Sequence, residues 1–120
     1  MCYNELVARV EFFTPEDGKS PIKEFIDRCE IKQQVKILRF LKYLEEFGLT
    51  TAIPNCRKLA GTPLWEIRIL GRDNIRIFYT PIGENRIVVL HIFSKKKQKT
   101  PRKEVNVALK RYQFSSSLDK

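Results

Sequence analysis

Hydrophobic residues follow two different spacings along this chain of 120 residues. Near the N-terminus, apolar and polar residues alternate, with Ala8, Val10 and Phe12 on one side, which is the two-residue period of a β-strand. The apolar residues then recur every three or four positions as far as Phe47, which is the period of an amphipathic helix. Alternation returns after Phe47, and a helical period closes the chain.

These periods, together with turn residues between them, predict seven elements. They are a strand over Tyr3–Phe13, a helix from Pro21 to about Cys29, a helix over Ile31–Phe47, three strands over Leu64–Leu70, Ile75–Thr80 and Arg86–Phe93, and a helix from Thr100–Pro101 to about Tyr112. Residues 49–63 are predicted to form an irregular loop.

Two helix boundaries carry specific signals. Ser20 followed by Pro21 is typical of an N-cap with proline at the first helical position, and Gly48 occupies the place of a helix C-terminal glycine. The helix over Ile31–Phe47, which ends before Gly48, is predicted to pack through an apolar face, which Ile37 and Phe40 widen. Its main members are Ile31, Val35, Leu38, Leu41, Leu44 and Phe47.

The order strand, helix, helix, strand, strand, strand, helix predicts an α+β fold. Short polar connections between the last three strands predict antiparallel hairpins, so we expect a single antiparallel sheet with the helices mainly on one face. The other face would then be partly open to a ligand. Residues 1–113 are expected to form a single domain, and residues 114–120, which include Ser115–Ser117, a disordered tail.

The net charge of the chain indicates which class of partner it binds. The chain has a net charge of +9 and a pI near 9.7, which favours polyanions such as RNA, DNA or the ribosome. No apolar run approaches the roughly 20 residues that span a bilayer, so we expect no membrane partner. The first residues lack a signal-peptide pattern, and three widely spaced cysteines with one histidine suggest neither disulfides nor a metal site. A cytoplasmic protein without a metal or cofactor is expected.

Much of the positive charge lies in one segment near the C-terminus. Between Ser94 and Arg111 there are eight lysines or arginines against one acidic residue. Lys95, Lys96, Lys97 and Lys99 form a run that is held between a strand and a helix, so these cations should occupy a defined place on the surface. The alternative is a solvated loop that only raises solubility.

Strand parity predicts that Arg68 and Arg76 lie on the same face of the sheet, close together. Arginine suits bidentate contact with phosphate, and both side chains could converge with the lysine run on one groove. The alternatives are that these arginines are solvated on the strand face or form ion pairs, for example Arg68 or Arg76 with Glu66. His91 is either a core residue or an acid–base group. Phe78 and Phe93 could stack on a base or belong to the core.

Three blocks in this region resemble a known family. They are Leu64–Arg68, Ile75–Tyr79 and Leu90–Lys96 with Gln98–Pro101 and Glu104. In these residues the chain is similar to the phage-related, HigB-like branch of the RelE/ParE toxin superfamily. The likeness extends over most of the chain and is most specific in residues 59–111.

The resemblance implies a type II toxin that cleaves mRNA on the ribosome as a metal-independent endoribonuclease. Arg68 and Arg76 would stabilise the scissile phosphate, Lys95 or Lys96 would act as base or acid, and His91 would be a further acid–base candidate. The implied partners are a helix-turn-helix antitoxin, the ribosome and mRNA. The remaining implied RNA or ribosome contacts are Arg57, Lys58, Lys97, Lys99, Arg102, Lys103, Phe78 and Phe93.

Two other functions remain open from the sequence. A ParE-like inhibitor of DNA gyrase would use the same fold to bind a protein target without cutting RNA. A basic nucleic-acid-binding module would bind without catalysis. The gyrase inhibitor would not require the lysine run to converge with Arg68 and Arg76.

Overall fold

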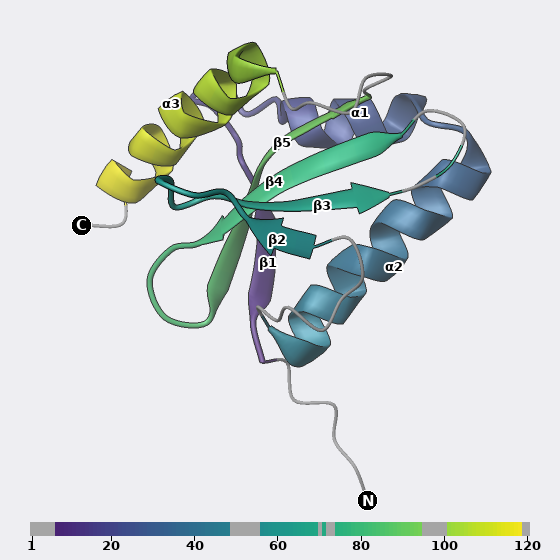
Figure 1. The fold of residues 1–120 in the computed structure, drawn as a ribbon, viewed down its shortest axis with the longest axis horizontal. Helices are drawn as coiled ribbons and strands as arrows, with labels where there is room; N and C mark the ends of the chain where they lie inside the picture. Colours follow the sequence, from purple (N-terminus) through teal and green to yellow (C-terminus); the bar gives the residue numbers. More distant parts are fainter. Residues whose placement is uncertain (1–6, 49–55, 70, 72–73, 95–100, 119–120) are drawn as a thin grey trace, which may run out of the picture.

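The structure is a computed structural model that describes residues 7–48, 56–69, 71, 74–94 and 101–118 (Figure 1). Five strands and three helices occur in these ranges. Their bounds are β1 Arg9–Phe12, α1 Pro21–Arg28, α2 Ile31–Phe47, β2 Cys56–Lys58, β3 Trp65–Ile69, β4 Ile75–Pro81, β5 Arg86–Ser94 and α3 Arg102–Leu118. The predicted α+β class is confirmed. The part of the first predicted strand that precedes Val7 lies outside the described residues.

All five strands form one sheet in the order β1-β5-β4-β3-β2. The three hairpin strands pair antiparallel as predicted, but β1 pairs parallel with β5, so the expectation of a purely antiparallel sheet was wrong. A parallel pair of this kind joins segments far apart in the chain, with Val10 opposite Ile87. No turn sequence connects the two strands directly, so a local sequence pattern could not predict the pair. The second correction is β2, which forms inside the predicted loop and pairs with β3. Three residues are too few to show a strand period.

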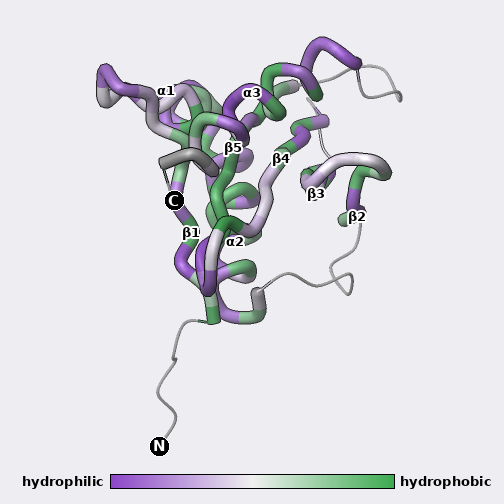
Figure 2. The backbone as a smooth tube through the Cα atoms, turned by 90° about the vertical axis from the view of Figure 1, so that its left-hand side faces the viewer, coloured by the Kyte–Doolittle hydropathy of each residue, from purple (hydrophilic) through white to green (hydrophobic). Residues whose placement is uncertain are grey.

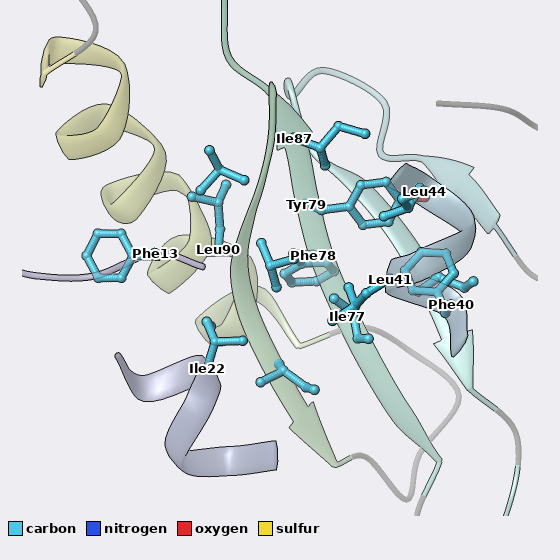
Figure 3. Close-up of a cluster of buried hydrophobic side chains, with 14 of the residues drawn as sticks. Phe13, Ile22, Phe40, Leu41, Leu44, Ile77, Phe78, Tyr79, Ile87 and Leu90 are labelled. Carbon is cyan, nitrogen blue, oxygen red and sulfur yellow. The ribbon is translucent and has the colours of Figure 1, made fainter. Parts of the chain in front are cut away.

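Helices cover both faces of the sheet, which corrects the expectation that they lie mainly on one. Tyr79 and Phe78 are neighbours on β4 and therefore point to opposite faces. The Phe40 ring of α2 packs edge-on against Tyr79 at 5.5 Å between centroids. The Phe78 face carries His91, which bonds to α3. In Figure 3, Phe13, Ile22 and Leu90 lie on one side of β5, while Phe40 and Leu44 lie beyond β4.

The core is built around β4 and β5, which are buried along most of their length. Figure 2 shows the hydrophobic colouring along β5 inside the molecule. Ser20 caps α1 by accepting a hydrogen bond from the Lys23 backbone nitrogen, and Gly48 ends α2 with φ 71°, so both predicted boundaries are confirmed. None of the helices in the described ranges is long and apolar enough to cross a membrane.

The buried face of α2 differs from the predicted one. Ile37, Phe40, Leu41 and Leu44 are buried, whereas the other predicted members of that face are exposed. The sequence places apolar residues on two sides of this helix, and periodicity alone does not say which side meets the sheet. The exposed residues are Ile31, Val35, Leu38 and Phe47.

The last helix is longer than the sequence predicted. α3 continues past Tyr112 to Leu118, so residues 114–118 of the expected disordered tail are helical. The reason is tertiary, because the Phe114 ring packs edge-on against Phe13 at 5.8 Å between centroids. Three consecutive serines are weak helix formers, and this contact anchors the helical turn that contains them.

We expect Phe114→Ala to lower the free energy of unfolding by about 1–2 kcal/mol, because an aromatic pair and partly buried ring surface are lost. Urea unfolding followed by circular dichroism measures the change. Gln113→Ala, at the exposed neighbouring position, is the control and should stay within about 0.5 kcal/mol of the wild type. Equal stability of both variants would show that the end of α3 is not held by this ring.

Candidate functional site

A row of side chains crosses the Phe78 face of the sheet from one edge to β5. The strand register sets Arg57 of β2 opposite Glu66 of β3, Glu66 opposite Phe78 of β4, and Phe78 opposite His91 of β5. Residues directly opposite each other on neighbouring strands share a face. The sheet therefore places the charged Arg57 and Glu66 on one side of the Phe78 ring and the imidazole of His91 on the other.

Glu66 is the centre of the first group. Its side chain is 0% exposed and accepts two charged hydrogen bonds, from Arg57 Nε to Oε1 at 3.0 Å and from Arg76 Nη1 to Oε2 at 3.2 Å. Arg76 is 6% exposed, while Arg57 is 60% exposed. Arg76 thus compensates the buried carboxylate. The hydrogen bond from Nε to Glu66 holds Arg57 in position. The Arg57 side chain is otherwise exposed, so its terminal guanidinium nitrogens face the surface.

Arg68 supplies a second exposed guanidinium beside this group. It lies directly opposite Arg76 in the β3–β4 register, as strand parity predicted. It lies two positions after Glu66 along β3, with only Ile67 between them, which places it diagonally from Arg57 on the same face. Of the two predicted phosphate-binding arginines, Arg68 is therefore on the surface and Arg76 lies in a buried ion pair. The ion-pair alternative that the sequence left open is realised for Arg76.

His91 lies at the other end of the row and joins β5 to α3. Its Nε2 lies 3.1 Å from Glu104 Oε1, and its Nδ1 lies 3.1 Å from Arg111 Nη1. Arginine can only donate, so Nδ1 accepts, and the ring proton is on Nε2, which donates to Glu104. Arg111 Nη1 also donates to the Leu90 carbonyl oxygen at 3.0 Å. Both ring nitrogens are hydrogen-bonded, and the imidazole links β5 to α3.

The environment of His91 favours its neutral form. Burial lowers the pKa of His91 below its ordinary value of 6.5, and the nearby Arg111 guanidinium acts in the same direction. Glu104 acts in the opposite direction without reversing the shift. Protonation of Nδ1 would also set an N–H against the Arg111 donor. The tether between β5 and α3 is thus a property of neutral His91.

We expect the stability of the protein to fall as the pH drops below about 6.5. Because the folded pKa of His91 is lowered, the unfolded chain binds its proton more readily, so the stabilising contribution is complete above the unfolded pKa and is lost below it. Urea unfolding on both sides of that pH measures the effect. His91→Gln should flatten the profile there, since the sequence has only one histidine. An unchanged profile in that variant would contradict the assignment.

The other basic residues that were predicted to contact RNA or the ribosome do not all lie on the same face as Arg57. Lys58 is exposed but lies opposite Trp65, which places it on the other face from Arg57. Arg102 and Lys103 are exposed at the start of α3. The predicted residues Lys95, Lys96, Lys97 and Lys99 lie outside the described residues. The strand that precedes them is described. β5 ends at Ser94, one residue after Phe93, which pairs with Arg76.

The two aromatic residues that could have stacked on a base are buried. Phe78 is completely inaccessible, and Phe93 is also in the core. Their rings pack edge-on at 5.3 Å between centroids, and His91 stacks on Phe93 at 5.2 Å. These contacts give both rings a packing role beneath the charged groups, and in this structure neither ring is presented to a ligand.

A cavity of about 270 Å³ lies elsewhere, between β1, β5 and the end of α3. Its lining includes Phe12, Phe13 and Phe114 together with the pair Glu11 and Arg86, whose Oε1 and Nη2 are 2.9 Å apart. The hydrogen bond from Arg86 lowers the pKa of the Glu11 carboxyl. The charged groups that line this cavity neutralise each other. The exposed face that carries Arg57 and Arg68, which we call the arginine surface, is therefore the better candidate for binding a polyanion.

Sequence reasoning did not identify Glu104 and Arg111 as members of the site. Glu66 was considered only as an ion-pair partner. A signal for the first two existed, because Glu104 and Arg111 are seven residues apart and therefore share one face of α3, next to a strand with the only histidine. Nothing in the local sequence showed that Glu66 is completely buried.

A comparison with protein families finds one match over most of the chain. The family described as Phage derived protein Gp49-like (DUF891) matches residues 24–113. This range contains Arg57, Glu66, Arg68 and Arg76 as well as the groups around His91. No curated protein matches the chain.

Proposed function

Because this chain belongs to the phage-derived Gp49-like family, which is part of the RelE/ParE-like toxin superfamily, we propose that it is a ribosome-dependent endoribonuclease. It would be the toxin of a type II toxin–antitoxin pair, of the HigB-like branch, and would inhibit translation by cleaving mRNA. Membership of a toxin family implies a cognate antitoxin. The helix-turn-helix type of that antitoxin, the ribosome and mRNA are the proposed partners, and the cytoplasm is the proposed location.

The observation that carries the proposal is the exposed arginine surface above Glu66. Arg57 is held through Nε, and Arg68 lies diagonally from it on the same face. Two neighbouring guanidinium groups on one exposed face suit the non-bridging oxygens of a phosphodiester, which they can contact in a bidentate manner. The buried carboxylate orients Arg57 without cancelling the positive charge of the surface, since Arg76 also compensates it.

RNA cleavage through the ribose 2′-oxygen needs three functions. A base removes the 2′-hydroxyl proton, cations stabilise the charge that develops on the phosphate, and an acid protonates the leaving 5′-oxygen. In the proposed reaction Arg68 and Arg57 supply the stabilisation, and Lys95 or Lys96 exchanges the protons, as neighbouring cations lower the pKa of a lysine. His91 is a weaker candidate for this step, because both of its ring nitrogens are bonded.

The direct test is mRNA cleavage in a purified translation system, mapped by primer extension. We expect cuts within the translated region, which disappear when ribosomes are omitted or when Lys95 and Lys96 are both replaced by alanine. Arg9→Ala, an exposed arginine on β1 at the opposite edge of the sheet, is the matched control and should cleave normally. Intact mRNA together with inhibition of DNA gyrase would overturn the proposal in favour of a ParE-like function. RNA binding without cleavage would overturn it in favour of a non-catalytic module.

A further inference from the structure

The outer face of α2 carries apolar side chains that nothing in the described structure covers. Ile31, Val35 and Leu38 are 77%, 44% and 52% exposed, and we call these three residues the α2 stripe. Their spacing of four and three residues places them in one line along the helix. Lys42 follows four residues after Leu38 and continues the line. Aligned aliphatic residues at this spacing are typical of a surface that packs against another helix.

Basic side chains lie along one side of the α2 stripe and at its C-terminal end. Lys32, Arg39 and Lys42 are all exposed on α2, whose first turn contains no acidic residue. A lysine near the N-terminus of a helix opposes the helix dipole and slightly destabilises the helix. Helix stability therefore gives no reason for this lysine, nor for the aliphatic side chain of Ile31 next to it. Both features have a common explanation if a partner covers this face.

We propose that the α2 stripe is the docking surface for an acidic amphipathic helix of a partner protein. The aliphatic residues would pack against the apolar side of that helix, and its glutamates or aspartates would meet Lys32, Arg39 and Lys42. Charge complementarity decides between occupants, because a second copy of this chain would oppose the same cations to one another. A nucleic acid would use the cations but would leave the exposed aliphatic residues unexplained.

The position of α2 separates this surface from the arginine surface. α2 packs on the Tyr79 face of the sheet, whereas Arg57 and Arg68 lie on the Phe78 face. A helix bound along the α2 stripe would therefore leave the arginine surface open. Protein and polyanion could bind at the same time, and the docking surface does not depend on the proposed ribonuclease activity.

The experiment uses the full chain and a fluorescent designed peptide in which leucines at heptad spacing are flanked by glutamates. Fluorescence anisotropy should show binding to the wild type, and a scrambled peptide of the same composition should bind at least about tenfold more weakly. A peptide with lysines in place of the glutamates should not bind. The scrambled peptide separates helix docking from general attraction to a protein of charge +9.

Variants of the chain test the location. Val35→Ser combined with Leu38→Ser should weaken peptide binding about tenfold, whereas Val7→Ser, at an apolar position that is 52% exposed outside the stripe, should not. Lys42→Glu should also weaken it, in contrast to Lys110→Glu at an exposed position of α3. Circular dichroism verifies that each variant is folded.

Three results would overturn the proposal. The first is equal binding of the acidic and scrambled peptides, and the second is unchanged binding by the stripe variants. The third is self-association of the chain, or binding to phosphatidylserine vesicles, that the stripe variants abolish while the acidic peptide fails to bind. Analytical ultracentrifugation and vesicle sedimentation measure these alternatives directly.

Discussion

Replacing Glu66 with glutamine is expected to lower the free energy of unfolding by about 3–5 kcal/mol. The Glu66 side chain is completely buried and bonds to Arg76, which is itself buried. Glutamine keeps the size of the side chain but removes its charge, so the Arg76 guanidinium loses a carboxylate partner inside the protein. Urea unfolding of the variant and the wild type measures the difference.

Two further variants test the cause of this loss. Arg57→Ala removes the other partner of Glu66, but its side chain is 60% exposed, so we expect a loss below about 1 kcal/mol. Glu66→Leu combined with Arg76→Met removes both buried charges and should be more stable than Glu66→Gln alone. If Glu66→Gln and Arg57→Ala cost the same, the compensation of Arg76 by Glu66 is not what stabilises this region.

Arg68→Ala is expected to lower the rate of mRNA cleavage by about 10²–10³ while the free energy of unfolding changes by no more than about 0.5 kcal/mol. Arg68 is exposed and lies beside the fixed guanidinium of Arg57, so its removal takes away charge stabilisation without disturbing the core. Single-turnover cleavage on programmed ribosomes gives the rate, and urea unfolding gives the stability.

The matched comparison is Arg76→Ala, at the position opposite Arg68. Because Arg76 is buried against Glu66, we expect this variant to lose activity together with stability. Arg9→Ala, on the far edge of the sheet, should change neither rate nor stability. A cleavage rate of Arg68→Ala equal to that of the wild type would remove Arg68 from the proposed reaction and leave the family assignment unchanged.

Strand parity explains why part of the site could be predicted. Side chains alternate between the two faces of a strand, so residue numbers alone placed Arg68 and Arg76 on one face, and the register sets them opposite each other. Parity carries no information about depth. On the same face Arg68 is exposed, whereas Arg76 and Phe78 are buried. The burial of a side chain depends on which parts of the chain cover the sheet at that position.

The contacts of His91 illustrate the same limit in another way. The sequence showed a lone histidine near a strand end, with packing and acid–base chemistry as alternatives. The structure sets its two ring nitrogens against Glu104 and Arg111, which belong to a helix that returns after the end of β5. Hydrogen bonds between distant segments depend on how α3 docks, and no local pattern encodes that geometry.

By itself, the sequence determined the α+β class, the order of the helices and of the hairpin strands β3, β4 and β5, and the concentration of positive charge near the C-terminus. These follow from local periodicity, turn residues and composition, which act over a few residues. Only the tertiary structure decided the parallel β1–β5 pair, the face of α2 that meets the sheet, and the burial of Arg76 with Glu66. These depend on which segments cover one another, and burial then separates a surface arginine from a structural one.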